Sequence, residues 1–227
     1  MSEQRLPIAV LVPVLNEAGR IGALLRSLSA MDFAEIIIAD GGSTDGTQRI
    51  VQTFALAKLI DCERGRGSQI TAAATIATCP LLVIVHADSG LPSGAPQVIR
   101  ETLDQPGVAA GCFRLRFEPA TPVLAFYSWF TRFESRFTTF GDQCYFMRRK
   151  TFDAAGGAPS WPLLEDVELR RRILAHGRFV KRPEIVVTSA RRFAKHGVIA
   201  QQLRNGLVLA GYACGVPVQR LAQLYNI

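Results

Sequence analysis

The sequence predicts an α/β fold in which a mainly parallel β-sheet is flanked by helices. Short apolar runs rich in branched residues alternate with segments whose apolar residues recur at helical spacing. Acidic or glycine-containing segments directly follow three of these runs. Strands buried on both faces and joined by right-handed crossover helices produce this alternation.

The first half of the chain carries the regular part of the pattern. We expect strands at Ile8–Val14, Glu35–Ala39, Lys58–Cys62 and Pro80–Val85, separated by helices at Asn16–Met31, Thr47–Ala57 and Gly67–Thr78. Ligands of parallel sheets bind beyond the carboxyl ends of the strands. The polar loops after Val14, Ala39 and Val85 should therefore lie at one ligand-binding edge.

The second half is less regular. We expect strands at Val108–Phe117, Gln143–Arg148 and Phe179–Thr188, an aromatic-rich helix at Pro122–Phe140 and a helix at Glu165–His176. One or two amphipathic helices should fill His196–Tyr225. We expect this tail to cover the core or to pair with another subunit, and docking on a membrane is the alternative.

The composition indicates a globular protein without a spanning helix. Hydrophobic residues make up 48% of the 227 residues, enough for a buried core. The N-terminus lacks the features of a signal peptide, and the longest apolar run, within Gly206–Val218, is shorter than the roughly 20 residues that span a bilayer. The five cysteines are scattered and form no CxxC pair, which is typical of reduced thiols. We therefore expect a cytoplasmic protein, and peripheral contact with the inner face of the membrane stays open.

The chain is basic, with a net charge of +7 and a sequence pI of about 9.5. Such a charge suits phosphates, anionic membranes or nucleic acid. No motif of a nucleic-acid-binding module accompanies it, so we expect no nucleic-acid partner.

The segment DGGSTDGT, residues Asp40–Thr47, combines acidic side chains with three glycines. Glycine permits tight turns and close approach of a ligand to the backbone. Asp40 would end a strand, where its carboxylate could accept the imide N–H of a uracil, whereas Asp45 is better placed to cap the next helix. An ordinary strand-to-helix turn is the alternative, and the full octapeptide argues against it.

Two other loops place carboxylates at the same edge. In PVLNE, Asn16 would cap a helix and Glu17 would favour its positive N-terminus, and such a terminus also binds ligands. HADSG follows the most apolar strand, and a charged residue there, Asp88, is typical of a paired or metal-bound carboxylate. One carboxylate with diphosphate oxygens and water suits Mg²⁺ or Mn²⁺. A solvated loop aspartate is the alternative, and for His86 we expect a supporting role rather than metal ligation.

PLLEDVELRRR places Glu165 and Asp166 at the head of a helix. Carboxylates are common at that position because they complement the helix dipole. Taken alone, the pair indicates no more than that, and a catalytic interpretation depends on its combination with the other loops.

Together, PVLNE, DGGSTDGT, RGRGSQ, HADSG and LLEDVELRRR resemble the motifs of the GT-A glycosyltransferases of the large inverting family that includes cellulose, chitin and dolichyl-phosphate-mannose synthases. The motifs stand in the family's order and span residues 7 to about 180. HADSGLP, GDQCYFMRR and GYACGVPVQRLAQLY are also similar to a compact bacterial subgroup without membrane helices, associated with radical-SAM enzymes or arsenosugar biosynthesis.

The resemblance implies a Rossmann-like GT-A domain at residues 1–195 and a short helical extension at 196–227. Within the domain, the nucleotide-sugar half would comprise about residues 1–105 and the acceptor half about residues 106–195.

The resemblance also implies roles for individual residues. Asp40 would read the base, Asp88 would hold the divalent metal and Asp166 would be the general base. The nucleoside pocket would be formed by Pro13, Leu15, Glu17 and Asp40, and the remaining contacts to the nucleotide-sugar would come from Gly42, Arg66, His86, Ala87 and Arg192, with Lys195 or His196 as alternatives to Arg192. Asp142, Gln143 and Trp161 are candidates for the acceptor side, and core packing is the alternative for Trp161.

One departure from the family bears on the metal. The first acid of the family's DxD motif is replaced by His86, so fewer protein carboxylates would hold the ion. The late QxxRW motif is absent, as expected for a non-processive enzyme.

The expected function is metal-assisted transfer of a sugar, preferably from a UDP-sugar, to an acceptor hydroxyl with inversion. The sequence leaves open whether the chain forms a homodimer. A sugar-phosphate nucleotidyltransferase is the first alternative, although such enzymes usually carry a Gly-rich loop with Arg and Lys where this chain has PVLNEAGR. A membrane-surface or scaffold protein that retains the fold without catalysis is the second.

Overall fold

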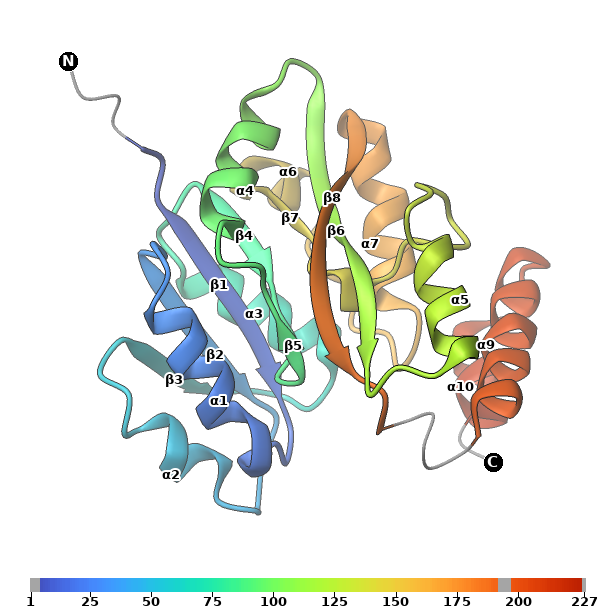
Figure 1. Cartoon of the computed structure of the whole chain (residues 1–227), viewed down its shortest axis with the longest axis horizontal. Helices are drawn as coiled ribbons and strands as arrows, with labels where there is room; N and C mark the ends of the chain where they lie inside the picture. The colour runs from blue at the N-terminus through green and yellow to red at the C-terminus, as the bar shows by residue number, and fades with distance from the viewer. Residues whose placement is uncertain (1–4, 192–196, 226–227) are drawn as a thin grey trace.

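The computed structural model describes residues 5–191 and 197–225 (Figure 1). A mixed eight-stranded sheet runs through the molecule in the order β3-β2-β1-β4-β7-β6-β8-β5. Its strands are β1 (Ile8–Val14), β2 (Glu35–Asp40), β3 (Ala57–Asp61), β4 (Leu81–Ile84), β5 (Ser89–Gly90), β6 (Val108–Glu118), β7 (Phe146–Arg148) and β8 (Arg178–Ser189). The first four are parallel, β6 is parallel to β8, and β7 runs antiparallel between β4 and β6. The predicted α/β fold with a mainly parallel sheet is confirmed.

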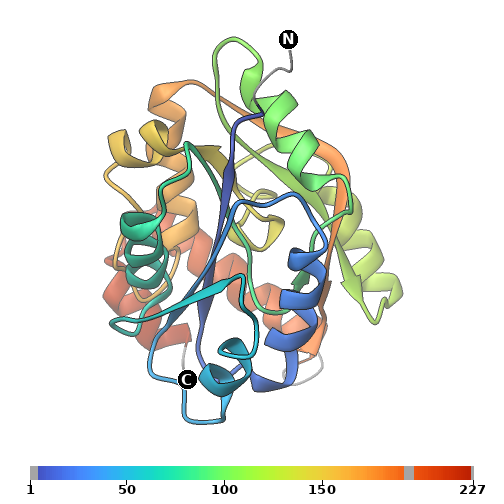
Figure 2. The same ribbon diagram turned by 90° about the vertical axis from the view of Figure 1, so that its left-hand side faces the viewer.

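Helices cover both faces of the sheet, and Figure 2 shows α1 and α3 on opposite sides of it. The α-helices are α1 (Ala18–Ser29), α2 (Thr47–Val51), α3 (Arg66–Ile76), α4 (Ala95–Asp104), α5 (Pro122–Phe130), α6 (Arg149–Ala154), α7 (Glu165–Ile173), α9 (Val198–Ala213) and α10 (Val218–Tyr225). Two 3₁₀ helices, η1 (Gly141–Gln143) and η2 (Leu174–His176), complete the described elements.

The core forms one apolar layer on each face of the sheet, because side chains of a strand alternate between its two faces. On β1, Val10 and Val12 belong to the layer beneath α1, whereas Ala9 and Leu11 belong to the layer beneath α3. Every residue of β1 is buried. Burial on both faces explains why this strand reads as a continuous apolar run rather than an alternating one.

Several elements differ from the sequence-based expectations: α2 ends at Val51 instead of Ala57, and β5 and α6 were not expected. The helix expected at Pro122–Phe140 ends at Phe130, and Thr131 Oγ1 then accepts the Leu115 N–H (3.0 Å), which fixes the chain against the part of β6 beyond its pairing with β7. The strand expected from Gln143 begins only at Phe146, after η1 and a left-handed residue. The helix α4 had no counterpart in the prediction, and its proline lies in the first turn, where a missing N–H is tolerated.

The C-terminal helices α9 and α10 pack beside α7 (Figure 1). Val208 and Leu221 form a small buried cluster with Leu164, which directly precedes α7. The extension therefore contacts the segment that carries Glu165 and Asp166.

Candidate functional site

The carboxyl ends of β1, β2 and β4 lie at one edge of the sheet. Val14 at the end of β1 is paired with Asp40 at the end of β2, and Leu11 is paired with Ile84 in β4. The segments that follow these strands therefore emerge from the same edge, as the parallel pattern predicts. They contain the PVLNE, DGGSTDGT and HADSG motifs.

Hydrogen bonds join the first two of these loops. The Asn16 N–H donates to Ser43 Oγ (2.8 Å), and the Thr44 N–H donates to Asn16 Oδ1 (2.8 Å). The prediction that Asn16 caps α1 is wrong, because its side-chain oxygen binds the neighbouring loop. Asp45 accepts the Ala18 N–H at the start of α1 (3.0 Å) and, as predicted for a capping residue, the first N–H of α2 (3.0 Å).

Asp40 is fully buried at the end of β2, and donors surround its carboxylate. Its Oδ2 accepts the Gly42 N–H (3.2 Å), the Ser43 N–H (2.9 Å) and Gln48 Nε2 (2.7 Å), and the Ser43 hydroxyl donates to Oδ1. Burial alone would raise the pKa of Asp40, but the hydrogen bonds from Ser43 and Gln48 lower it below its ordinary value. In this arrangement Asp40 shapes the loop, and a base could reach its carboxylate only if one of these donors turned away.

Gly42 lies within this loop, and the hydrophobic residues predicted for the nucleotide site lie in β1 or follow β1 and β4. Gly42 has a φ of +92°, where a side chain would strain the backbone. Pro13 is buried within β1, Leu15 is half-buried beyond its end, and Ala87 is buried after β4.

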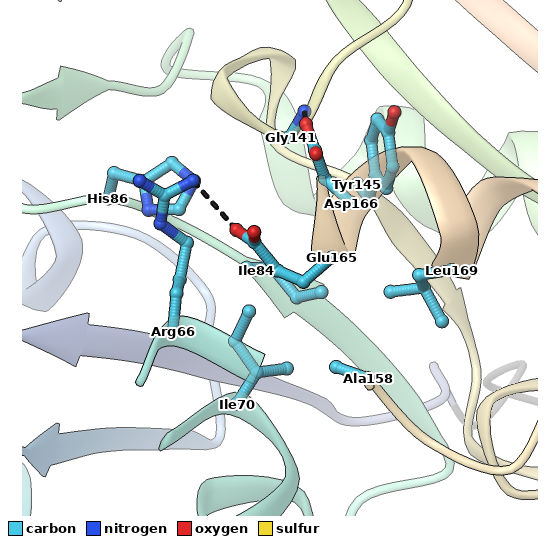
Figure 3. Close-up of a pocket in the computed structure, with 10 residues that line it drawn as sticks. All are labelled: Arg66, Ile70, Ile84, His86, Gly141, Tyr145, Ala158, Glu165, Asp166 and Leu169. Atoms are coloured by element: carbon cyan, nitrogen blue, oxygen red, sulfur yellow. Dashed lines mark hydrogen bonds and ion pairs between the residues drawn. The ribbon is translucent and has the colours of Figure 1, made fainter. Parts of the chain in front are cut away.

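A pocket between α3, β4 and α7 contains Arg66, His86, Glu165 and Asp166 (Figure 3). Arg66 Nη1 lies 2.7 Å from Glu165 Oε1 and forms an ion pair with it. The remaining residues that line the pocket are Ile70, Ile84, Gly141, Tyr145, Ala158 and Leu169. The structure thus brings together three of the predicted site residues that are far apart in sequence: Arg66, His86 and Asp166.

Asp166 is held in this pocket by backbone donors. The Gly141 N–H donates to its Oδ2 (2.6 Å), and the Val167 N–H donates to its Oδ1 (2.9 Å). A Cβ atom added at Gly141 would lie 3.0 Å from the Cβ of Asp166, so a larger residue would displace the carboxylate. The sequence indicated neither Gly141 nor the partner of Arg66, because both relationships depend on tertiary structure.

The Arg66–Glu165 pair alters the electrostatics of the pocket. Burial raises the pKa of Glu165, and Arg66 only partly offsets this effect. Burial would lower the pKa of Arg66, but the carboxylates of Glu165 and Asp166 raise it. Arg66 is therefore a permanent cation between two acids, and in this conformation one acid already engages it.

Asp88 lies in the short connection between β4 and β5. Its backbone oxygen accepts the Ser189 N–H (3.3 Å), which fixes this connection to the end of β8. Burial raises the pKa of the Cys144 thiol well above its ordinary value, and the carboxylates of Asp142 and Asp88 raise it further. Asp40 and Asp88 are not among the described residues that line the Arg66 pocket, although their loops share its edge of the sheet.

No group of three or more His, Cys, Asp or Glu side chains that could hold a metal ion occurs within residues 5–191 and 197–225. Asp88 is half-buried and lies in the loop after the buried strand β4. A single carboxylate at such a place fits Mg²⁺ or Mn²⁺ only if a substrate and water supply most of the ligands, which is the usual arrangement for Mg²⁺ with phosphates.

Glu17 in the PVLNE loop forms an ion pair with Arg191, which lies just after the end of β8. Its carboxylate pairs with Arg191 through Oε1 and with Arg20 through Oε2 (3.3 Å). The sequence analysis missed Arg191, which immediately precedes the predicted diphosphate residue Arg192. Arg192 itself, with Lys195 and His196, lies outside the described residues. The Glu17–Arg191 ion pair places Arg191 beside the PVLNE loop.

The predicted acceptor-side residues occupy different surroundings. Gln143 is buried and its Nε2 donates to Thr138 O (2.8 Å), so it supports a loop. Asp142 is half-buried in η1, next to the glycine that binds Asp166. Trp161 packs against Tyr212 of α9, with ring centroids 6.2 Å apart.

The segment before Trp161 contacts α3 closely. Thr71 Oγ1 accepts the Ala158 N–H (3.2 Å) and donates to Ala158 O (3.1 Å). A Cβ atom at Gly67 would lie 1.8 Å from Pro159 O, so only glycine fits there. Gly156 and Gly157 both have positive φ and form a left-handed turn that leads into this contact.

The fold and its loop-lined edge define a class of protein, the GT-A-like α/β proteins. S. aureus TarS residues 1–349 superimpose with a TM-score of 0.65 at 17% identity, covering 82% of this chain and 61% of that one. Glucosyl-3-phosphoglycerate synthase from Mycobacterium tuberculosis, solved with Mn²⁺, UDP and glucosyl-3-phosphoglycerate, gives 0.60 at 18% identity and covers 93% and 81%. At these identities the likeness establishes the fold.

The family follows from the sequence match. The family model for glycosyl transferase family 2 matches residues 9–158, more than half of the chain, and the chain belongs to this family. An uncharacterised glycosyltransferase of Mycobacterium tuberculosis is 27% identical over 95 residues, which cover 41% of this chain and 43% of that protein. The succinoglycan biosynthesis protein ExoA of Rhizobium meliloti is 46% identical over 50 residues, 20% of this chain and 15% of that protein. The matches thus span less than half the length of these relatives.

Proposed function

We propose that this glycosyltransferase passes a sugar from a UDP-sugar to an acceptor hydroxyl with inversion, and that Asp166 is the general base. The observation that carries the proposal is the pocket in which Asp166 lies beside Arg66 and His86, at the sheet edge shared by the nucleotide-side loops. TarS has been solved with UDP-GlcNAc and the glucosyl-3-phosphoglycerate synthase with UDP and Mn²⁺, which supports a uridine donor. A hexosyl donor and the radical-SAM-associated subgroup remain predictions.

The proposed reaction is a single displacement. The acceptor oxygen forms a bond to the anomeric carbon as the bond to the diphosphate oxygen breaks, and the hydroxyl proton passes to Asp166. The Gly141 and Val167 N–H groups orient the carboxylate for this transfer. A general base positioned in this way contributes roughly 10²–10⁴ in rate.

The leaving diphosphate requires positive charge. Arg66 would supply it if the diphosphate competed with Glu165 for the guanidinium. A divalent ion held by Asp88 would add Lewis-acid stabilisation of the leaving group when bound.

The first experiment is Asp166→Asn. We expect sugar transfer to fall by roughly 10²–10⁴, with UDP binding in a thermal-shift assay unchanged. Asp153→Asn, which alters an exposed carboxylate on α6, is the matched control and should retain transfer. Transfer by Asp166→Asn at the control rate would refute the base assignment.

A second experiment tests the metal. Stabilisation by UDP should increase when Mn²⁺ is added, and Asp88→Asn should abolish the increase without changing the metal-free protein. Incubation with a nucleoside triphosphate and a sugar phosphate tests the nucleotidyltransferase alternative, since pyrophosphate release would support that reaction instead. Absence of both reactions with every UDP-sugar would favour the non-catalytic scaffold.

A further inference from the structure

Four exposed aromatic rings form a cluster on α5 and the turn after it. Phe126, Trp129, Phe130 and Phe133 expose 64%, 45%, 38% and 48% of their surface. Ring centroids are 5.0 Å apart for Phe126–Phe130, 5.1 Å for Trp129–Phe130 and 5.3 Å for Trp129–Phe133. We call these four residues the aromatic surface. Contiguous exposed apolar groups of this kind mark interaction sites more often than isolated ones do.

The composition of α5 is not explained by the core of the protein. The helix contains no charged residue, and Leu124 is its single buried residue. A helix that packs on a core usually keeps one apolar stripe and makes the opposite face polar. The exposed side of α5 is instead aromatic, so its sequence suits an apolar or interfacial environment.

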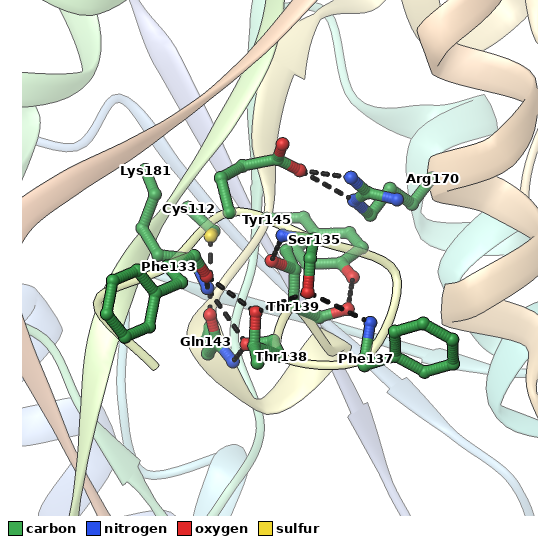
Figure 4. A network of polar contacts seen from close by, with 11 residues as sticks. Cys112, Phe133, Ser135, Phe137, Thr138, Thr139, Gln143, Tyr145, Arg170 and Lys181 are labelled. Atoms are coloured by element: carbon green, nitrogen blue, oxygen red, sulfur yellow. Dashed lines mark hydrogen bonds and ion pairs between the residues drawn. The ribbon is translucent and has the colours of Figure 1, made fainter. Parts of the chain in front are cut away.

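A polar network holds the segment after α5 in place (Figure 4). Lys181 Nζ donates to Phe133 O (2.9 Å) and to Thr138 O (2.8 Å), and Tyr145 donates to Thr139 O (3.0 Å). In Figure 4 the ring of Phe133 points away from this network. The exposure of the ring is therefore built into the fold rather than being the result of a loose loop.

The surroundings of the aromatic surface are cationic. The guanidinium carbon of Arg132 lies 4.5 Å from the Trp129 ring centroid, and that of Arg136 lies 4.7 Å from the Phe137 ring. Between Pro119 and Phe137 the single acid is Glu134, which is already paired with Arg170.

The neighbouring helix α9 also exposes apolar side chains and contains no acidic residue. Burial raises the pKa of Tyr127 in α5, and the nearby Gln202 side chain of α9 partly offsets this, so the two helices lie close together. Leu203 and Leu207 of α9 expose 65% and 74% of their surface. The sequence contains no acidic residue after Glu184.

We propose that the aromatic surface docks on an anionic lipid bilayer, with Arg132 and Arg136 reaching the lipid phosphates. Aromatic rings partition into the headgroup region, and arginine side chains extend from apolar surfaces to interfacial charge. Each cationic residue near an anionic leaflet strengthens such binding. The contact is peripheral, since none of the described helices is long and apolar enough to cross a membrane.

The charges favour a bilayer over a second copy of this chain. A two-fold contact through the aromatic surface would bring the same arginines of both copies together. Glu134, the acid nearest to them in the sequence, is engaged by Arg170 and would not relieve this repulsion. An anionic bilayer supplies the opposite charge directly.

The test is co-sedimentation of the full chain with vesicles of phosphatidylglycerol and phosphatidylcholine, compared with vesicles of phosphatidylcholine alone. We expect stronger binding to the anionic vesicles. Phe126→Ser/Phe130→Ser should lower the partition coefficient about tenfold, because two rings no longer enter the interface. Arg132→Gln should lower binding to the anionic vesicles about fivefold and leave binding to phosphatidylcholine unchanged.

Leu6→Ser/Leu56→Ser is the matched control, because it removes two exposed apolar side chains (52% and 66%) that precede β1 and β3, strands separated from β6 in the sheet order. This variant should bind as the parent does. The protein has two tryptophans, so in a Trp161→Phe background brominated lipids should quench Trp129. Circular dichroism verifies that each variant is folded.

Three results would overturn the proposal. The first is failure of the parent protein to bind the anionic vesicles. The second is binding of Phe126→Ser/Phe130→Ser at the level of the control, together with no quenching of Trp129 in the Trp161→Phe variant. The third is a dimer in sedimentation that Phe126→Ser/Phe130→Ser converts to a monomer, which would assign the surface to a second copy. None of these measurements depends on sugar transfer, so they stand apart from the proposed function.

Discussion

The hydroxyl of Tyr212 in α9 donates a hydrogen bond to Glu168 Oε2 in α7 (2.9 Å). The ring of the same tyrosine packs against Trp161, which precedes α7 in the chain. The C-terminal helices therefore contact the chain on both sides of Asp166. This geometry makes the extension a support for the candidate site.

Tyr212→Phe should lower the free energy of unfolding by about 1 kcal/mol. The hydroxyl donates to a buried carboxylate, and hydrogen bonds to charged groups exceed the neutral average, but two arginines continue to bind Glu168. Urea denaturation measures the change. Tyr225→Phe is the control, because that hydroxyl contacts neutral Asn205 and should matter less. An equal loss in both variants would show that the Glu168 contact is not special.

Lowering the pH should reduce the free energy of unfolding, because Glu168 becomes protonated. The hydrogen bond from Arg171, together with Arg172 and Tyr212, lowers the pKa of Glu168 from 4.5 to about 2 despite burial. A folded-state pKa below the unfolded one means that the ionised carboxylate stabilises the fold above about pH 4.5, and that this contribution disappears as the pH falls toward 2.

The measurement compares the parent with Glu168→Gln at about pH 6 and about pH 3. We expect the stability difference between the two proteins to shrink at the lower pH, by an amount on the order of 2 kcal/mol. A difference that is the same at both pH values would mean that the ionisation of Glu168 does not contribute to stability.

The fold could be predicted largely from sequence because its signals are local. The run Ile8–Val14 is apolar throughout because both of its faces are buried, and Gly46 and Thr47 begin α2 where the loop motif ends. The limits of α5 could not be predicted in this way. They depend on Thr131 contacting Leu115 of β6, 16 residues earlier in sequence, and no local pattern encodes that contact.

The candidate site could be predicted in part, with the same limit. The loops that hold Asp40, Asp88 and Asp166 could be singled out as motifs, and the parallel sheet predicted a common edge for the first two. The state of each side chain could not be read from sequence: Asp40 is enclosed by its own loop, and Arg66 pairs with Glu165, 99 residues away. Side-chain partners across such distances exist only after the chain has folded.

Gly67→Ala should be strongly destabilising, although alanine favours helices. The added Cβ would lie 1.8 Å from Pro159 O, so α3 and the segment before Trp161 would have to separate. Overpacking of this kind costs about 1–3 kcal/mol. Gly94→Ala is the control, since nothing lies within 4 Å of its added Cβ. Thermal denaturation should separate the two variants, and equal melting temperatures would contradict the close approach.

Substitutions of the two members of the Arg66–Glu165 ion pair should differ clearly in their effects on stability and on UDP binding. Arg66→Gln leaves Glu165, whose side chain is 5% exposed, beside Asp166 without a cation. Removing one partner of a buried pair costs about 3–5 kcal/mol, and we expect the lower end because the Arg66 side chain is 38% exposed. Glu165→Gln retains an acceptor for Arg66 and removes the charge, so its loss should be smaller.

The two variants should also respond differently to pH and to ligand. Burial already raises the pKa of Glu165, so the carboxylate of Arg66→Gln should regain stability as it protonates below neutral pH, whereas Glu165→Gln has no such carboxyl to titrate. In Glu165→Gln the guanidinium is no longer neutralised by Glu165, and UDP should therefore bind more tightly than to the parent. Urea denaturation at two pH values and calorimetric titration with UDP measure both effects. Weaker UDP binding by Glu165→Gln would show that Glu165 orients Arg66 for the diphosphate instead of competing with it.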